Sequence, residues 1–518
     1  MGFLIWSLPS LEVLSFTSSQ LQDALSLWLV LSCTLLVLGW DFLRNKSARK
    51  IPFVDTRGRW EYTYTGAKRR FVTDGAEIIA SGLEKYPLFY TITDKGLQLI
   101  LSGEYADEIQ RRDDSFSRLE SFETDWYARM SSANGKSHAA FARHLASKLT
   151  TVMPALIQPL SEEVGIALRA SLTDKQEWSE IPLSRTMVRI ISQTSTRAFA
   201  GQGLCRNSKW IESSTTLAHS ILAVTQRLYE WPRSLHGLVT WFEPSARQLR
   251  CRTKECQRLF ESLLEIWRQM IKEDGNEGDQ RQPEFNLMDT MLESPDVKEK
   301  PDNLFMAQLA LALAAVHSTT DILGKVILDL ARNPHMIEPL RQEIISVVGQ
   351  RGLGIDTVSE LKLLDSVLKE TQRMNPVSTL PIHRIATQKV TLNDGTIIPR
   401  GTEIALSTNR TMDPDIHASP DKWDGYRFFN MQKTSSEEKS GLVDLSSDHL
   451  GFGYGKHACP GRFFAAHESK IVLCHILLKY DWTLVDPRVP NIEMRGCSPI
   501  VNSVVKIAVR RRNSEIEL

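Results

Sequence analysis

The sequence predicts a mostly α-helical domain with small peripheral β-sheets, preceded by a single transmembrane helix. Three observations indicate this fold class. Beyond residue 50, apolar residues recur at steps of three and four, which is the period of an amphipathic helix. The strand-like pieces are few and short, and one apolar run without charges lies near the amino end. With 518 residues, the chain is long enough to bury a ligand in a large core.

Composition and charge exclude a few classes of protein. Lys+Arg and Asp+Glu both number 62, so the chain lacks the basic excess that is typical of a nucleic-acid-binding protein. The 7 cysteines are scattered over the chain and form no Cys-x-x-Cys pair. We therefore expect neither a disulfide framework nor a structural zinc site, and the cysteine usage suits a reducing compartment.

The apolar run near the amino end is predicted to anchor the chain in a membrane. Residues 24–40 contain no charged side chain, and Trp28 and Trp40 are placed to lie at the membrane interfaces. Basic residues follow the run directly, which predicts that the rest of the chain is cytosolic: Arg44, Lys46, Arg49 and Lys50. A cleaved signal peptide is the alternative, but its basic residues would precede the apolar run.

These features divide the chain into four expected parts. Residues 1–23 form a luminal segment, 24–42 the transmembrane anchor, 43–59 a basic linker and 60–518 the large folded domain. This arrangement predicts a single-pass protein of the endoplasmic reticulum membrane whose folded domain faces the cytosol.

Helical periodicity accounts for most of the chain after the linker. It predicts helices over 138–152, 184–200, 211–229, 247–273, 302–332, 334–349, 359–374 and 461–479. Short strands are expected at 98–101, 389–392, 402–406 and 504–509. Asn393-Asp394-Gly395 predicts a hairpin turn between two of these strands. The polar stretches 273–283 and 432–441 are expected to be surface loops.

A glycine-rich loop at 452–462 (FGYGKHACPGR) contains the most informative cysteine, Cys459. The amphipathic pattern of 462–480 places this cysteine just before a helix N-terminus, where free amides and the helix dipole favour a thiolate. Such a thiolate can act as a nucleophile or as an iron ligand. The nucleophile hypothesis lacks an oriented general base, because nothing evident orients the nearby His457. A buried structural cysteine is the remaining alternative.

The loop resembles the haem-binding signature of the cytochrome P-450 family, Phe-x-x-Gly-x-[Arg/His]-x-Cys-x-Gly. It matches at Phe452, Gly455, His457, Cys459 and Gly461. The resemblance implies the cytochrome P-450 fold and haem b (iron protoporphyrin IX), with the Cys459 thiolate as the axial ligand of the iron. It also implies that Phe452 packs against the haem beside the sulfur. His457 would replace the usual Arg and donate one hydrogen bond to a haem propionate.

Motifs upstream of the loop extend the resemblance. Glu370 and Arg373 lie three residues apart on a predicted helix and can pair, although such pairs are usually exposed and weak. The family's pattern implies that Arg427 completes a Glu370–Arg373–Arg427 network that supports the cysteine loop. It also implies that Arg384 binds a haem propionate. Arg143 matches a second propionate Arg, although the Trp expected four residues before it is replaced by Ala.

The predicted helix over 304–331 is apolar on most faces, which is typical of a buried helix. Its polar cluster begins with His317, Ser318 and Thr319, and buried polar groups in mid-helix indicate a site. The cluster is similar to the family's distal helix, with His317 in place of the usual acid and Ser318 in place of the usual Thr. A shift of one residue would put Thr319 in that place. His317 could relay protons or simply bond a neighbouring carbonyl.

Over residues 60–510 the resemblance implies a monooxygenase that converts RH, O2, two electrons and two protons to ROH and water. NADPH-cytochrome P-450 reductase would supply the electrons, with cytochrome b5 as a second candidate donor. The motifs look similar to fungal members that oxidise terpenoids in secondary metabolism. The resemblance implies that segments 115–134, 311–319, 378–383 and 497–501 contact the substrate. The apolar distal helix and Leu380-Pro381-Ile382 suggest an apolar pocket that fits a lipophilic substrate. Two alternatives remain open: the same fold catalysing isomerisation, dehydration or ring coupling, and an inactive membrane-anchored binding or scaffold protein.

Overall fold

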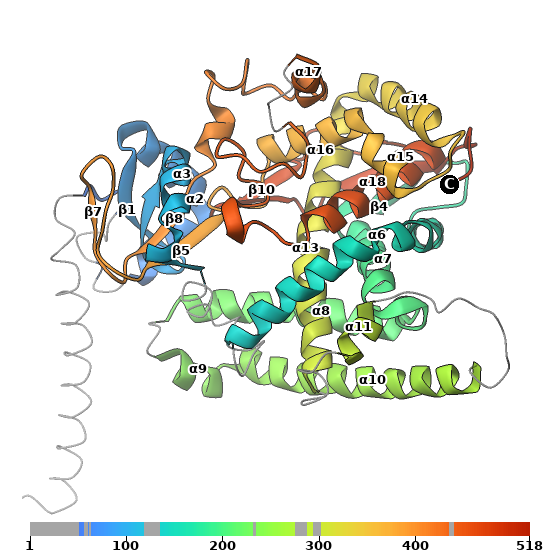
Figure 1. Ribbon diagram of the computed structural model, residues 1–518, viewed down its shortest axis with the longest axis horizontal. Helices are drawn as coiled ribbons and strands as arrows, with labels where there is room; N and C mark the ends of the chain where they lie inside the picture. The colour runs from blue at the N-terminus through green and yellow to red at the C-terminus, as the bar shows by residue number, and fades with distance from the viewer. Residues whose placement is uncertain are drawn as a thin grey trace, which may run out of the picture. The chain divides into compact units, whose positions relative to one another are not determined.

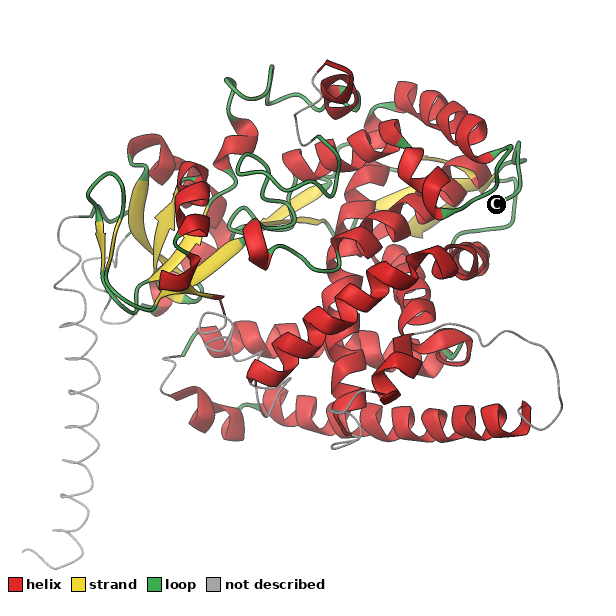
Figure 2. Cartoon of the chain, in the orientation of Figure 1, coloured by secondary structure: helices red, strands yellow, loops and turns green. Residues whose placement is uncertain are grey.

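Helices make up most of the described chain, and small sheets lie beside them (Figures 1 and 2). This computed structural model describes residues 51–55, 61, 64–118, 135–231, 235–274, 287–293, 302–434 and 440–518. They fall almost entirely in one unit, Phe53–Leu518. The predicted luminal segment and anchor lie outside the described residues, as does most of the predicted linker. The predicted mostly helical class with small sheets is confirmed.

The helices of the described chain vary widely in length. Their bounds are α2 (Thr65–Lys85), α3 (Ala106–Arg111), α6 (Gly135–Ser171), α7 (Leu183–Cys205), α8 (Ser208–Tyr229), α9 (His236–Phe242), α10 (Pro244–Asp274), α11 (Leu287–Glu293), α13 (Asp302–Arg332), α14 (Ile337–Val348), α15 (Ile355–Glu360), α16 (Lys362–Met374), α17 (Arg427–Thr434) and α18 (Arg462–Lys479). The main hydrophobic core lies among these helices.

The strands join segments from distant parts of the chain. A five-stranded sheet has the order β1-β2-β8-β5-β3, a three-stranded sheet the order β4-β12-β9, and two pairs are β6-β7 and β10-β11. Their bounds are β1 (Leu88–Thr93), β2 (Gly96–Leu101), β3 (Phe116–Ser117), β4 (Ser179–Pro182), β5 (Ile382–Ala386), β6 (Val390–Thr391), β7 (Ile397–Ile398), β8 (Glu403–Leu406), β9 (Tyr480–Leu484), β10 (Ile492–Arg495), β11 (Ser498–Val501) and β12 (Lys506–Arg511). Within the largest sheet, β2 and β8 pair in parallel.

Helix α13 passes through the middle of the helical part of the chain (Figure 1). It ends at Arg332 before Asn333-Pro334, as predicted, because a proline restricts the preceding residue and cannot continue the hydrogen-bond ladder. By length and composition it could span a bilayer, but 56% of its most apolar window is buried inside the protein. We therefore interpret α13 as a core helix.

Two helix boundaries differ from the prediction. The helix expected over 138–152 is α6, which continues to Ser171 with Pro154 and Pro159 inside it. Buried Leu156 and Leu160 pack into the core on this continuation, and their burial offsets the hydrogen bonds that the prolines remove. The helix expected over 359–374 is two helices, because Leu361 has a non-helical ψ of 79°.

The predicted hairpin is correct in its turn but wrong in its partner strand. Gly395 has a φ of 83°, and its N–H donates to the carbonyl of Leu392 over 2.9 Å. Strand β6 therefore pairs with β7, a two-residue strand that the sequence did not reveal. The expected partner, β8, lies between β2 and β5. The loop predicted for 432–441 is also partly wrong, because α17 includes Thr434.

Candidate functional site

The loop that precedes α18 is closed by its own backbone. The amide of Cys459 donates to the carbonyl of Phe452 over 2.7 Å, and that of Ala458 donates to Gly455 over 3.1 Å. Gly453 and Gly455 have φ values of 75° and 66°, which L side chains rarely adopt. These glycines let the loop fold back on itself so that Cys459 stands three residues before Arg462, where α18 begins.

The surroundings of the Cys459 sulfur differ from the expectation that the helix end alone yields a thiolate. Burial raises the pKa of this thiol, and the amide of Gly461 and the charges of Arg118 and Arg462 offset only part of the rise. The predicted stabilising groups are therefore present but weaker than desolvation. A metal ion bound to the sulfur would reverse this balance, because coordination deprotonates a thiol.

A cluster of positive and hydrogen-bonding groups lies beside the loop, around Asp113. The carboxylate of Asp113 lies 3.1 Å from Nε2 of His457 and 2.6 Å from Nζ of Lys456. Arg384, on β5, is 4.0 Å from the same carboxylate, and Arg118 donates to the carbonyl of His457 over 3.0 Å. The structure therefore brings the predicted His457 and Arg384 together, and adds three charged residues that sequence reasoning missed.

Arg384 has unused hydrogen-bonding capacity. Its side chain is 8% exposed, and its Nε has no hydrogen-bond partner among the described residues. Burial lowers its pKa to about 10, with a further contribution from Arg118 that Asp113 opposes. A buried guanidinium of this kind is stabilised by an anion that accepts from it. The fourth predicted contact, Arg143, lies on α6, but its side chain is outside the described residues.

The distal helix presents one accessible stripe. Leu311, Ala314, Ser318 and Ile322 recur at helical steps, and none of them is buried, although most of α13 is. Ser318 lies in this stripe and donates to the carbonyl of Ala314 over 3.0 Å. Thr319 points to another face and is only 2% exposed. Ser318 is therefore the more accessible of the two hydroxyls.

His317 contacts a second histidine that sequence reasoning missed. Its ring meets that of His219, on α8, edge to face at 4.8 Å between centroids. Burial, with a smaller contribution from His219, lowers the pKa of His317 to about 4. Its imidazole is therefore neutral near pH 7. Nε2 of His317 is buried without a hydrogen-bond partner in the described chain, so the predicted bond to a neighbouring carbonyl is not made by this atom.

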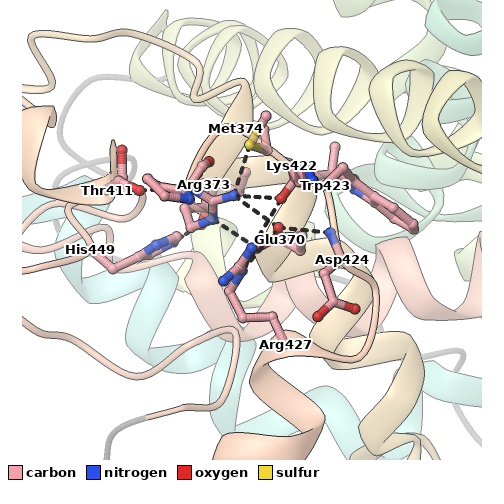
Figure 3. A network of polar contacts seen from close by, with 12 residues as sticks. Glu370, Arg373, Met374, Thr411, Lys422, Trp423, Asp424, Arg427 and His449 are labelled. Carbon is pink, nitrogen blue, oxygen red and sulfur yellow. Dashed lines mark hydrogen bonds and ion pairs between the residues drawn. The ribbon is translucent and has the colours of Figure 1, made fainter. Parts of the chain in front are cut away.

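Glu370, Arg373 and Arg427 form a buried network, as Figure 3 shows. Nε of Arg373 donates to Glu370 over 2.8 Å, and Nε of Arg427 reaches both oxygens of Glu370 over 3.1 Å. The side chains of Glu370 and Arg373 have no exposed surface. Both arginines also donate to backbone carbonyls, which are those of Thr411, Ala418, Ser419, Pro420 and Lys422.

The network reaches the cysteine loop through two residues that the sequence did not suggest. Oε1 of Gln372, on α16, is 2.9 Å from Nε2 of His449, just upstream of the loop. A Cβ on Gly451 would lie 2.2 Å from the same oxygen, so the backbone at Gly451 packs directly against the Gln372 side chain. Glu370 and Arg373 therefore pair within α16. Their neighbour Gln372 contacts His449, which lies just before the cysteine loop.

The residues present fit a haem group. Cys459 offers one sulfur ligand, the glycines of its loop leave room for close approach, and Phe452 is partly buried against the core next to it. On one side of the loop lies Arg384, whose Nε has no hydrogen-bond partner in the described chain, together with Lys456 and His457, which suits two carboxylates. Iron, an apolar macrocycle and propionates would each find a complementary group here.

Comparisons with known proteins bear on the family and the fold. Residues 92–507 match the family model described as Cytochrome P-450. The cytochrome P-450 monooxygenase hepE of Aspergillus oryzae is 34% identical over 530 residues, covering 98% of this chain and 96% of that protein. The cytochrome P-450 monooxygenase esdpI of Penicillium shearii is 36% identical, covering 90% and 92%. The structure of retinoic-acid-bound cyanobacterial CYP120A1 has the same fold, with a TM-score of 0.66 at 18% identity, covering 89% of this chain and all of that chain.

Proposed function

The chain belongs to the cytochrome P-450 family and is a haem monooxygenase, and on this premise we propose that it transfers one atom of O2 to a lipophilic small molecule. The substrate would be a terpenoid or a related secondary metabolite. Electrons would pass from NADPH through a flavoprotein reductase, with cytochrome b5 as a second donor. The observation that carries the proposal is the apolar stripe of α13, interrupted by the hydroxyl of Ser318. This stripe combines an apolar surface with one hydroxyl group that can donate a proton.

The residues of the site have separable tasks. Bound haem supplies the activation of O2 and the transfer of oxygen. The Cys459 sulfur would hold the iron, while Arg384 and His457 would hold the propionates by charge-assisted hydrogen bonds. Ser318 holds a proton on its Oγ, which now donates to the carbonyl of Ala314. His317, neutral at physiological pH because its pKa is about 4, can pass a proton but does not store one.

The ligand assignment is tested with Cys459→Ala in the full-length protein. We expect this variant to lose the absorption that the CO complex of a thiolate-ligated haem shows. Cys205→Ala is the matched control, because Cys205 is a buried free cysteine on α7, away from the loop, and its removal should leave the spectrum intact. An unchanged spectrum in Cys459→Ala would falsify the assignment. A wild-type protein that takes up no haem would instead favour the binding or scaffold alternative.

One observation keeps a non-oxygenating reaction as a second candidate. His317 stands where the family has an acid, and it is a neutral group in a buried place. Isomerisation and dehydration are redox-neutral and would not need proton delivery to oxygen, whereas ring coupling is an oxidation that would reduce O2 to water without placing oxygen in the product. Turnover with labelled O2 separates the two functions, because a monooxygenase consumes O2 and NADPH in proportion to labelled product. A product that contains no label would establish the second candidate: without use of NADPH for isomerisation or dehydration, and with use of O2 and NADPH for ring coupling.

The substrate is best sought genetically. Deleting the gene should cause one precursor to accumulate, and feeding that precursor to microsomes with reductase should yield the missing product. The same microsomes test the proposed location in the endoplasmic reticulum membrane, with residues 24–42 as the anchor and the catalytic domain in the cytosol. We expect the chain to resist extraction with alkaline carbonate and to be digested by protease added outside. Release by carbonate would contradict the anchor.

A further inference from the structure

We propose that the buried ion pair Asp321–Lys325 of α13 ties together three segments that wall the substrate pocket, and so helps to determine which substrates fit. The inference rests on the proposed function, since the resemblance places 311–319, 378–383 and 497–501 around the substrate. Neither residue belongs to the polar groups assigned above to oxygen activation. Both are positioning residues.

The first connection runs from α13 to the segment that follows α16. Lys325 is 1% exposed, and its ammonium pairs with Asp321, one turn earlier on the helix. The same Nζ donates to the carbonyls of Asn375 and Pro376 over 3.1 and 3.2 Å. An ammonium has three hydrogens, so all of its donors are used. The chain after Pro376 continues directly into the wall at 378–383.

The second connection runs from α13 to β11. The amide of Val501 donates to Oδ1 of Asp321 over 3.3 Å, so one carboxylate serves both Lys325 and the strand. Gly324 lies on the same side of the helix, and a Cβ there would be 3.0 Å from Cγ2 of Val501. The absence of a side chain at Gly324 therefore lets β11 pack directly on α13.

The third connection joins the segment that follows α16 directly to the segment that contains β11. The amide of Thr379 donates to the carbonyl of Cys497 over 2.7 Å, and its hydroxyl donates to the same oxygen over 3.2 Å. Each of the three segments is thus bonded to the other two. Ser318 precedes Asp321 by three residues, so the accessible stripe of α13 lies on the same side of the helix as the pair.

A role in pocket shape explains the pair better than a role in stability alone. Burying two opposite charges removes them from water, and the desolvation largely cancels their attraction. A lysine and an aspartate in mid-core are therefore a poor way to stabilise a helix that is otherwise apolar. Their contribution is geometric, because hydrogen bonds of fixed direction set where Asn375, Pro376 and Val501 lie.

The test uses the full-length, haem-loaded protein and two nitrogenous ligands of different bulk. Imidazole and clotrimazole coordinate iron through the same kind of nitrogen, but clotrimazole carries three additional aromatic rings and is far bulkier. The variant is the double substitution Asp321→Ala with Lys325→Met, which removes both charges of the pair and all of its hydrogen-bonding groups. We expect the ratio of the two spectral dissociation constants to change at least threefold, with that for imidazole within twofold of wild type. A smaller change in the ratio overturns the proposal.

A matched pair elsewhere in the core is the control. Asp365 and Lys470 form a buried pair of the same residue types at 2.5 Å, and Asp365 also accepts from the amide of Leu442 over 2.6 Å. This pair joins α16 to α18 and touches none of the three walls. Asp365→Ala with Lys470→Met should leave the ratio unchanged. An equal shift in this control would mean that any buried pair has the effect, and the proposal would fail.

Hydrogen exchange decides the matter if the double variant retains no haem. Asp321→Ala removes the acceptor of the Val501 amide, so exchange in 498–501 should accelerate at least tenfold relative to β12. Gly324→Ala adds an independent arm, since it displaces Val501 without changing charge, and it should also shift the ligand ratio. Unchanged exchange and an unchanged ratio in these variants refute the inference. A wild-type chain that binds no imidazole refutes the proposed function instead, while the exchange result stands.

Discussion

Glu370 accepts hydrogen bonds from two arginines in a place without exposed surface, so each charge in the network depends on the others. Removing one partner of a buried ion pair leaves the remaining charge without compensation in a medium that solvates it poorly. The carboxylate also accepts from the amide of Asp424, over 2.9 Å. Glu370 therefore connects α16 to the segment that precedes α17, whereas an ordinary pair on a helix surface would join only residues of that helix.

Glu370→Gln is predicted to lower the free energy of unfolding by about 3–5 kcal/mol, because two buried guanidinium groups lose their counter-charge. The loss should be measured by urea unfolding, and the haem-to-protein ratio should fall with it. Glu360→Gln is the control, since Glu360 pairs with Arg351 on the surface, with both side chains half exposed. We expect no measurable change there. Equal stability of both variants would contradict a structural role for the network.

Ser318 and Thr319 are adjacent in sequence but differ in environment, and this difference yields a second prediction. Ser318→Ala should retain haem while a larger share of the NADPH consumed yields no product. Thr319→Val should leave coupling unchanged and raise stability by about 1 kcal/mol, because the buried Oγ1 of Thr319 has no hydrogen-bond partner in the described chain. The ratio of product to NADPH is the measurement. Uncoupling in Thr319→Val alone would place the helix register one residue later.

Helix α6 contains a proline on its accessible side. Pro154 is exposed, and it removes a backbone donor from the middle of a 37-residue helix. Pro154→Ala is therefore predicted to raise the free energy of unfolding by about 1 kcal/mol or more, measured by urea unfolding. Pro334→Ala should give no such gain, because Pro334 begins a short helix where no donor is required. A loss of stability in Pro154→Ala would indicate that the proline fits a bend that alanine does not support.

Much of the secondary structure could be predicted from local sequence, but the errors arise where tertiary packing outweighs local preference. The end of α13 follows from Asn333-Pro334, and the turn of β6 and β7 follows from Gly395. The continuation of α6 past Pro154 depends instead on burial against other helices, which the local pattern does not contain. The strand β7 is only two residues long and carries no alternation to detect.

The same distinction applies to the site. Cys459 and the Glu370 pair could be found because their partners lie within a few residues or within a dense motif. Asp113 and His219 could not, because each meets its partner only when distant parts of the chain fold together. Burial likewise determines that the pKa of the Cys459 thiol rises, and burial is not visible in a loop sequence.

The whole molecule contains ionisable groups that folding forces into their neutral forms. Glu468, on α18, is 1% exposed, and burial raises its pKa to about 8, against a smaller effect of the hydrogen bond from Ser195. Burial lowers the pKa of His475 to about 3 and that of His417 to about 4. The folded state therefore binds a proton on Glu468 more tightly than the unfolded chain does, and binds protons on the histidines more weakly.

Stability is thus predicted to be greatest near pH 6.5. Below this pH the unfolded chain takes up protons on histidines that stay neutral in the fold, so stability falls toward pH 4. Above pH 6.5, Glu468 is already ionised in the unfolded chain but still holds its proton in the fold. The free energy of unfolding therefore falls by about 2 kcal/mol between pH 6.5 and pH 8. Glu468→Gln should abolish the fall on the alkaline side, as measured by urea unfolding across pH. A wild-type curve that rises from pH 6.5 to 8 would contradict this.

The parallel pairing of β2 with β8 has a consequence for biosynthesis. The hairpin of β1 and β2 leaves the ribosome early, whereas β8 follows about 300 residues later, roughly 15–60 s at ordinary rates of translation. During that interval the open edge of β2, with its apolar Leu99 and Leu101, can pair with other nascent chains. A chaperone that covers the edge of β2 until β8 has been synthesised would prevent such pairing. Yield in a heterologous host should therefore depend on the speed of translation and on chaperone supply.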